Sequence, residues 1–245
     1  FQVHLDLDQI QDFNDIVFKL KNILELSNNE LKKIYREKER LKPWDTLVAS
    51  DNLSWTQFSK LNLYLHELEG VKPVVSSSRF YPYKDDLVHV VGYVGAASQK
   101  DIERDDIIKE NLVPGLKVGK SGIEFAKEHQ LIGRYGIKRY EVNSSGKRIS
   151  QIDHIKETQG EKIKLTVDLE VQQLAQELLK GKAGSISAMD IYTGEIIAMA
   201  SSPTYDPNKF THGIGHKDWG EIRDDPLKPL VNKSIAGLYL SLIHI

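Results

Sequence analysis

The sequence predicts an α+β chain with two domains, and three observations support this fold class. Its 245 residues exceed the usual length of one domain, so two cores are expected. Apolar residues recur at helical spacing through the first third. From residue 71 short β-branched runs interrupted by proline and glycine follow, and a second block with strand and helix patterns begins near residue 161.

Three helices are predicted in the first third. The first carries its apolar residues between Ile10 and Leu24. The next two begin at capping-box patterns, in which a serine is followed three residues later by Glu or Gln; the pairs are Ser27 with Glu30 and Ser54 with Gln57. No catalytic pattern accompanies these helices.

The middle of the chain reads as mixed helix and strand. Strand-like runs are predicted at 71–75 and 87–94, and a hairpin at 139–152 with its turn at 144–146. Ser98 with Asp101 caps a short helix, and a glycine-rich loop opens another helix at Ser121 with Glu124 at its third position. Residues 158–160 are predicted to be a linker.

The second block begins with a predicted strand at 162–167. A helix capped by Asp168 follows, with an apolar stripe made of Val171, Leu174, Ala175 and Leu178. A hairpin at 185–201 then reads as buried on both faces of a covered sheet. Few other strands are available to cover it, so some of its large side chains are expected to stay exposed: Ile186, Met189, Ile196, Ile197 and Met199. Beyond Pro203 the pattern predicts loops.

Composition excludes several classes of function. The 33 basic and 35 acidic residues give a net charge of -2, so no nucleic-acid partner is predicted. The chain has no cysteine, which excludes disulfides and thiolate metal sites. His212 and His216 have zinc-like spacing, but Gly213 and Gly215 argue against the helix that would align them, so no metal and no cofactor are predicted.

Two other motifs resemble functional sites but lack residues or spacing that those sites require. Gly115 to Ser121 resembles a phosphate-binding loop, but it is one residue short between the glycines and no apolar strand precedes it, so a glycine-rich helix entry fits better. Ser241 has His244 where a serine acylase would have lysine. No catalytic residue is therefore predicted.

Several segments carry a family likeness. They include Arg79-Phe80-Tyr81-Pro82, His89 to Gly95, Gly119 to Glu124, Leu131 to Gly133, Leu165 to Asp168, Met189 to Met199, Tyr205 to Asn208 and Asn232 to Tyr239. In this order they resemble the linking motifs and the opening of the transpeptidase domain in class B penicillin-binding proteins. Within that family the G-Y-V-G form and the insert before Arg79 are similar to the elongation branch.

The resemblance implies a pedestal (dimerisation-type) domain with a helical head insert at 1–158, the incomplete start of an α/β transpeptidase domain at 161–239, and a non-native tail at 240–245. It implies a penicillin-binding, serine-type peptidoglycan D,D-transpeptidase of the cell wall and of cell shape. That enzyme would lie on the periplasmic face of the inner membrane, with its anchor before Phe1. The family's S-x-x-K serine is expected after Tyr239, so this chain is expected to be an inactive fragment.

The resemblance also implies partners and motif residues. Stem peptides and β-lactams would bind the full-length protein, and elongation-complex scaffold and glycosyltransferase proteins would bind its pedestal. The predicted structural motif comprises Arg79, Tyr81, Pro82, Gly119, Gly122 and Glu124. Arg79 is interpreted as a buried brace in preference to a surface ion pair, whereas Glu124 could simply complete a capping box with Ser121.

Three hypotheses of function remain: a transpeptidase fragment, a non-catalytic module that recruits elongation partners, and a β-lactam sensor or hydrolase. The pedestal-type first block argues against the third.

Overall fold

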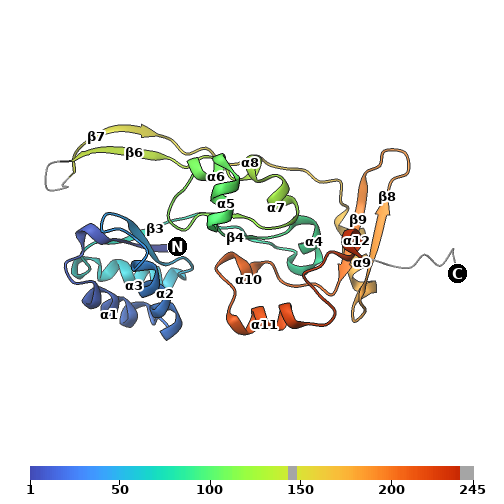
Figure 1. Ribbon diagram of the computed structural model, residues 1–245, viewed down its shortest axis with the longest axis horizontal. Helices are drawn as coiled ribbons and strands as arrows, with labels where there is room; N and C mark the ends of the chain where they lie inside the picture. Colours follow the sequence, from blue (N-terminus) through green and yellow to red (C-terminus); the bar gives the residue numbers. More distant parts are fainter. Residues whose placement is uncertain (143–147, 238–245) are drawn as a thin grey trace. The chain divides into compact units, whose positions relative to one another are not determined.

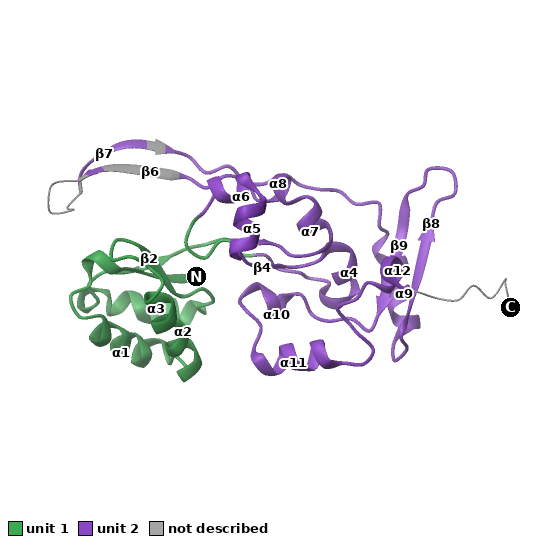
Figure 2. Ribbon diagram, in the orientation of Figure 1, with its two compact units in different colours: residues 1–78, 113–116 green, residues 79–112, 117–245 purple. Residues whose placement is uncertain are grey.

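The computed structural model describes residues 1–142 and 148–237, which form two compact units (Figures 1 and 2). Unit 1 comprises Phe1–Ser78 with Val113–Leu116, and unit 2 comprises Arg79–Leu112 and the chain from Lys117 onward. Both contain helices and strands, so the α+β prediction is confirmed. The predicted domain boundary at 158–161 falls inside unit 2, and the division into domains at 1–158 and 161–239 stays a prediction.

Unit 1 is built on a three-stranded antiparallel sheet with the order β2-β1-β3. Its strands are β1 (Gln2–Asp6), β2 (Thr46–Ser50) and β3 (Val71–Val74). The sequence predicted β3 but not β1 or β2, so the helical interpretation of the first third was incomplete.

Three α-helices complete unit 1: α1 (Phe13–Leu24), α2 (Asn28–Lys38) and α3 (Trp55–Leu63), with short 3-10 turns at η1 (Leu7–Gln9) and η2 (Leu65–Glu67). Both predicted capping boxes are present, at Ser27 with Glu30 and at Ser54 with Gln57. In each box the serine hydroxyl accepts from the third helical amide, and the Glu or Gln side chain accepts from the serine amide. These local signals explain why α2 and α3 were predictable, whereas α1 was predictable from its apolar spacing.

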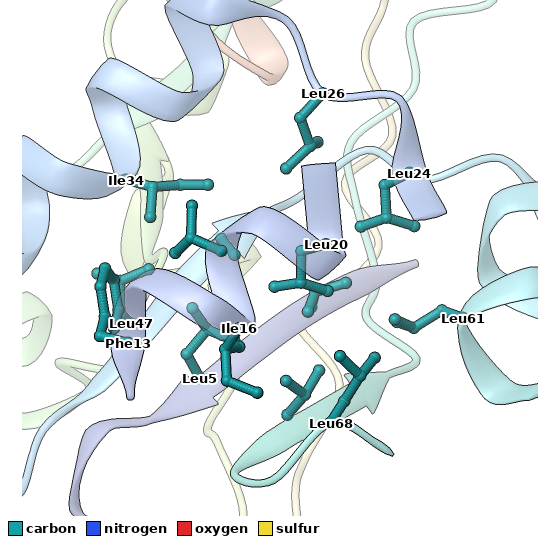
Figure 3. Packing of buried hydrophobic residues seen from close by; sticks show 14 of the residues in the cluster. Leu5, Phe13, Ile16, Leu20, Leu24, Leu26, Ile34, Leu47, Leu61 and Leu68 are labelled. Atoms are coloured by element: carbon teal, nitrogen blue, oxygen red, sulfur yellow. The ribbon is translucent and has the colours of Figure 1, made fainter. Parts of the chain in front are cut away.

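The core of unit 1 lies between the sheet and the helices (Figure 3). Leu5 of β1, Leu20 of α1, Leu47 of β2 and Leu61 of α3 are fully buried at 0% exposure. Burying a leucine side chain contributes about 1.5–3 kcal/mol, so these contacts alone make unit 1 a substantial folding unit.

The first part of unit 2 contains the family motifs. Strand β4 (Val94–Ala96) pairs antiparallel with β5 (Lys117–Gly119). Around them lie η3 (Lys84–Asp86), α4 (Val88–Val91), α5 (Gln99–Arg104), α6 (Asp106–Glu110), α7 (Gly122–Ala126) and α8 (Glu128–Leu131). The capping box of Ser98 with Asp101 is confirmed. The strand predicted at 87–94 is wrong over 88–91, where β-branched residues form a helical turn.

The remainder of unit 2 contains two hairpins and four helices. Strand β6 (Ile137–Val142) pairs with β7 (Arg148–Ile155), and β8 (Gly184–Met189) pairs with β9 (Ile196–Ser202). Both hairpins were predicted, although the turn at 144–146 lies outside the described residues. The helices are α9 (Leu169–Leu179), α10 (Asn208–Thr211), α11 (His216–Asp224) and α12 (Lys233–Ala236). The loop predicted beyond Pro203 is therefore wrong.

Two further predictions about this block are corrected. Residues 162–167 form no strand ladder; the contacts here are Thr166 Oγ1 donating to the Ile196 carbonyl and Asp168 N–H donating to the Ile197 carbonyl. Helix α9 buries Gln172, Ala175 and Leu179, so of the predicted stripe only Ala175 is covered. Its other members, Val171, Leu174 and Leu178, are exposed.

Hairpin β8–β9 is a two-stranded sheet and is not covered on both faces. Ala198 and Ala200 are buried against α9, whereas Met189 is 58% exposed. The expectation of incomplete cover is confirmed for Met189, and the covered-sheet interpretation is wrong. Within the described ranges, no helix is long and apolar enough to cross a membrane.

Candidate functional site

The predicted motif residues meet in unit 2. We call this cluster the motif junction and define it by Arg79, Tyr81, Gly92, Gly119, Gly122 and Glu124. It joins the segment 79–92 to β5 and α7, through an ion pair, a buried phenol and close contacts between main chains.

An ion pair and a phenol form the polar centre of the junction. Arg79 Nε lies 2.9 Å from Glu124 Oε1 and donates to Glu124 Oε2 at 3.2 Å. The Tyr81 hydroxyl donates to Glu124 Oε1 at 3.3 Å and accepts from the Val94 amide at 3.0 Å. Burial and the neighbouring Glu124 carboxylate raise the pKa of Tyr81, so the phenol stays protonated and serves as a donor. This geometry ties 79–81 to both α7 and β4.

The ion pair is unequal in exposure. The side chain of Glu124 is 7% exposed and that of Arg79 is 40% exposed. Arg79 was interpreted as a buried brace; its guanidinium does brace Glu124, but the buried partner is the carboxylate. The alternative that Glu124 completes a capping box with Ser121 is wrong, because the Ser121 side chain makes no cap hydrogen bond to α7.

Glycines allow the main chains of the junction to touch. A Cβ atom on Gly122, which has φ +60°, would lie 2.6 Å from both the Gly92 nitrogen and the Val90 oxygen. One on Gly119 would lie 2.2 Å from the main chain of Glu124. These approaches exclude any side chain, which is the physical reason for glycine at these positions.

A second carboxylate supports β5. Glu128 Oε2 accepts a hydrogen bond from the Gly119 amide. Burial raises the pKa of Glu128, and the hydrogen bond and Arg79 oppose this shift. On the other side of β5, Lys120 Nζ donates to Asp101 Oδ2 at 2.5 Å, which fastens α5 to the strand.

The junction also borders a cavity of about 340 Å³ within unit 2. Pro82, which is exposed at its outer side, lines this cavity with Arg79, Tyr81 and Glu124. The remaining lining is largely apolar and includes Val88, Ile123, Leu131, Ile163, Leu165 and Pro207. Arg79 and Glu124 are paired with each other at its edge, so the junction has the character of a structural joint.

Residues 79–93 also contact the later part of unit 2. The Tyr93 and Phe210 rings lie 4.3 Å apart, and His89 and Tyr205 meet edge to face at 5.8 Å. The Asn208 side chain binds both main-chain groups of Tyr81. The motif around Tyr205 to Asn208 is therefore packed on the motif around His89 to Gly95, as aromatic pairs of this geometry favour.

The other candidate sites of the sequence are placed as follows. His212 ends α10 and His216 begins α11, so no single helix aligns their rings. The segment that resembles a phosphate-binding loop, Gly115 to Ser121, includes strand β5. The helix that follows it, α7, has only five residues. Ser241 and His244, with the whole tail at 240–245, lie outside the described residues.

Three short serine patterns were not singled out by the sequence analysis. Ser27-Asn28-Asn29 and Ser50-Asp51-Asn52 match S-x-N; the first caps α2 and the second begins at the last residue of β2 in unit 1. Ser144 to Lys147 matches S-x-x-K and lies outside the described residues. None of these patterns is supported by a described contact with a catalytic partner.

Residues 1–165 match the penicillin-binding protein dimerisation domain family. The chain belongs to this family of penicillin-binding proteins. Its relatives include the peptidoglycan D,D-transpeptidase MrdA of Escherichia coli K12, which is 31% identical over 241 residues, covering 98% of this chain and 38% of that protein. MrdA of Acinetobacter baumannii is 30% identical, covering 98% of this chain and 35% of the relative.

A solved structure shares the architecture. The penicillin-binding protein PBP2 of Helicobacter pylori, in complex with MreC, matches with a TM-score of 0.79 at 26% identity, covering 95% of this chain and 43% of that one. PBP2 of Pseudomonas aeruginosa matches with a TM-score of 0.56 at 33% identity, over 69% of this chain and 33% of the other. The chain thus spans well under two thirds of the relatives it matches.

Proposed function

We propose that this chain is the pedestal and the opening of the transpeptidase domain in a peptidoglycan D,D-transpeptidase of the PBP2 type. The motif junction carries this proposal, because the residues that the family likeness selected lie in mutual contact. The domain division at 1–158 and 161–239, and the structural role of Arg79, Tyr81, Pro82, Gly119, Gly122 and Glu124, are parts of the same proposal.

The chemistry of the whole protein is serine acyl transfer between stem peptides. A serine attacks the penultimate D-alanine carbonyl, D-alanine leaves, and the amine of a second stem peptide resolves the acyl-enzyme. β-Lactams acylate the same serine. The junction residues contribute placement to this reaction, since their charged groups, Arg79 and Glu124, are engaged with each other. We place the enzyme at the periplasmic face of the inner membrane, in cell elongation and the maintenance of cell shape.

The test is covalent labelling by fluorescent penicillin. The complete protein that carries these residues is expected to give one labelled band that survives denaturation, whereas the 245-residue chain is expected to give none. Absence of label on the complete, folded protein, under conditions that label the E. coli relative, overturns the proposal. A stoichiometric band on the chain that vanishes in Ser241→Ala would place the nucleophile inside it.

A second candidate function is a non-catalytic module that binds elongation-complex proteins. The similarity to a PBP2 solved together with MreC favours it. We propose that residues 45–158 bind a scaffold protein of this kind, and that a polymerising glycosyltransferase also contacts the pedestal. Purified chain should capture such a scaffold from membrane extracts, and consistent failure with folded chain would leave the pedestal as a structural spacer.

A further inference from the structure

Three side-chain amides connect the segment 79–92 to the later part of unit 2. Gln172 of α9 is fully buried, and its Nε2 donates to the Asp86 carbonyl at 2.8 Å. Asn208 Nδ2 donates to the Tyr81 carbonyl at 3.0 Å, while its Oδ1 accepts from the Tyr81 amide at 2.9 Å. Asn232 Nδ2 donates to the His89 carbonyl at 3.1 Å.

All three amides also bond within their own part of the chain, and Asn208 does so through Nδ2, which donates to Asp206 Oδ1 at 2.9 Å. Gln172 Oε1 accepts from the Met199 amide of β9 at 2.8 Å, and Asn232 Oδ1 accepts from the Ser234 amide at 3.0 Å. An amide has a donor and an acceptor on one rigid plane, so it can bridge two main chains at once. These residues are therefore connectors between the segment 79–92 and elements α9, β9 and α12.

Polar contacts, and not core packing, set the position of α12. This helix has four residues and none of them is buried; Ile235, its largest apolar side chain, is 74% exposed. Asn232 caps its first turn, the Lys233 amide donates to Ser201 Oγ at 2.9 Å, and Ser234 Oγ donates to the Ala200 carbonyl at 3.0 Å. Its contact with the segment 79–92 runs through the amide of Asn232.

We propose that Gln172, Asn208 and Asn232 are positioning residues that transmit the placement of the segment 79–92 to the catalytic part of the protein. This inference rests on the proposed function, in which α12 leads toward the catalytic serine expected after Tyr239. When the junction shifts, the His89 carbonyl moves with it, and Asn232 carries that movement to α12. The rate of acylation then depends on a hydrogen bond between two residues that touch no substrate.

The experiment separates the donor of Asn232 from its capping oxygen. Asn232→Asp and Asn232→Ser keep an oxygen for the Ser234 amide, and both lose the Nδ2 donor to His89. Gln172→Glu loses the donor to Asp86 in the same way. Asn111→Asp is the matched control, because Asn111 Nδ2 donates at 2.9 Å to Ile107 inside its own exposed helix.

The measurement is the second-order rate of acylation of the complete protein by fluorescent penicillin, together with the melting temperature. Loss of one positioning hydrogen bond is expected to slow acylation by about tenfold in both Asn232 variants, while the protein stays folded with a melting temperature lowered only slightly and the control is unaffected. Acylation within about twofold of wild type in folded Asn232→Ser overturns the inference. A wild-type protein that is not acylated at all overturns the proposed function instead.

Discussion

At the residue scale, the unequal exposure of Arg79 and Glu124 determines which partner is costly to remove. Truncating Arg79 leaves the 7% exposed carboxylate without its cation, whereas Arg79 can reach water when Glu124 is neutralised. We expect Arg79→Ala to lower the free energy of unfolding by about 2–3 kcal/mol and Glu124→Gln by about 1 kcal/mol. The prediction is that Arg79→Ala costs more stability than Glu124→Gln.

Urea unfolding measures this difference in the free energy of unfolding, provided that the tryptophan signal comes from unit 2. Trp219 is the tryptophan of that unit, so the variants are made in a chain with Trp44→Phe and Trp55→Phe. Arg223→Ala is the control, because Arg223 pairs with Asp224 on the exposed surface. A larger loss in Glu124→Gln than in Arg79→Ala would contradict the assignment of Glu124 as the buried partner.

Asp101 makes the stability of unit 2 dependent on pH. Burial opposes its ionisation, but hydrogen bonds from Lys120 and Ser98 outweigh burial and lower the pKa of this carboxyl from 3.8 to about 2. The ionised form therefore stabilises the fold above about pH 4, and this stabilisation is lost as the pH falls from about 4 to about 2. The contribution is about 1–2 kcal/mol after allowance for partial exposure.

The measurement is the unfolding free energy of unit 2 against pH, in wild type and in Asp101→Asn. The variant is expected to be less stable at pH 7 and to show a shallower decline between pH 4 and pH 2. Parallel curves for the two proteins across this window would show that Asp101 is not the titrating group.

The family likeness directed attention to the correct residues but not to their partners. It selected Arg79, Tyr81 and Glu124, which lie in contact. Its segments included Asn208 and Asn232 without indicating their contacts, and did not include Gln172, because a single polar residue whose partner is a distant main-chain carbonyl leaves no periodic or local pattern. Gln172 lies outside the apolar stripe predicted for this helix, so no local signal marked it as buried.

At the element scale, the contact between α4 and α7 depends on glycine. Gly122→Ala would place a methyl group 2.6 Å from main-chain atoms of Gly92 and Val90 at φ +60°. Gly181→Ala is a matched control for backbone strain, because Gly181 has φ +75° and a methyl group there would meet nothing within 4 Å. We expect a loss of about 1 kcal/mol at Gly181 and about 3 kcal/mol or more at Gly122.

Thermal unfolding of the two variants distinguishes the backbone strain of a positive φ from the steric overlap of an added methyl group with neighbouring main-chain atoms. Equal melting temperatures would show that the main chains of α4 and α7 separate without cost, and that their close contact does not hold the junction together.

Elements with local signals were predictable and those with distant partners were not. The capping boxes at Ser27, Ser54 and Ser98 each involve residues three apart, so the sequence displays them directly. Strands β1 and β2 pair across the segment that contains α1 and α2, and no short pattern encodes that pairing. The run at 88–91 is β-branched, yet tertiary contacts override this weak preference and form a helix.

At the scale of the whole molecule, the chain contains separate cores. Unit 1 has a continuous core of fifteen buried apolar residues. Unit 2 has smaller clusters, one around Val88, Tyr205 and Phe210 and another around Ala175, Leu179 and Ala200. Hydrogen bonds from side chains supplement these small clusters, so the later part of unit 2 depends on the segment 79–92 for its stability.

This dependence leads to a prediction for limited proteolysis. Lys162 and Lys164 are exposed in the extended stretch that lacks a strand ladder, so trypsin is expected to cut there. The incomplete cover of hairpin β8–β9 favours loss of the block after the cut. The amide bridges and the contact between Tyr93 and Phe210 argue for the opposite result.

We therefore expect the nicked chain to elute as one species under native conditions and to separate into two fragments in denaturant. Mass spectrometry of the native peak should find residues from both sides of the cut. Asn232→Ser combined with Gln172→Leu removes two of the bridges and should release the second fragment, whereas Asn111→Asp should not. Release of residues 168–237 from the nicked wild-type chain would show that the segment 79–92 does not hold the later part of unit 2.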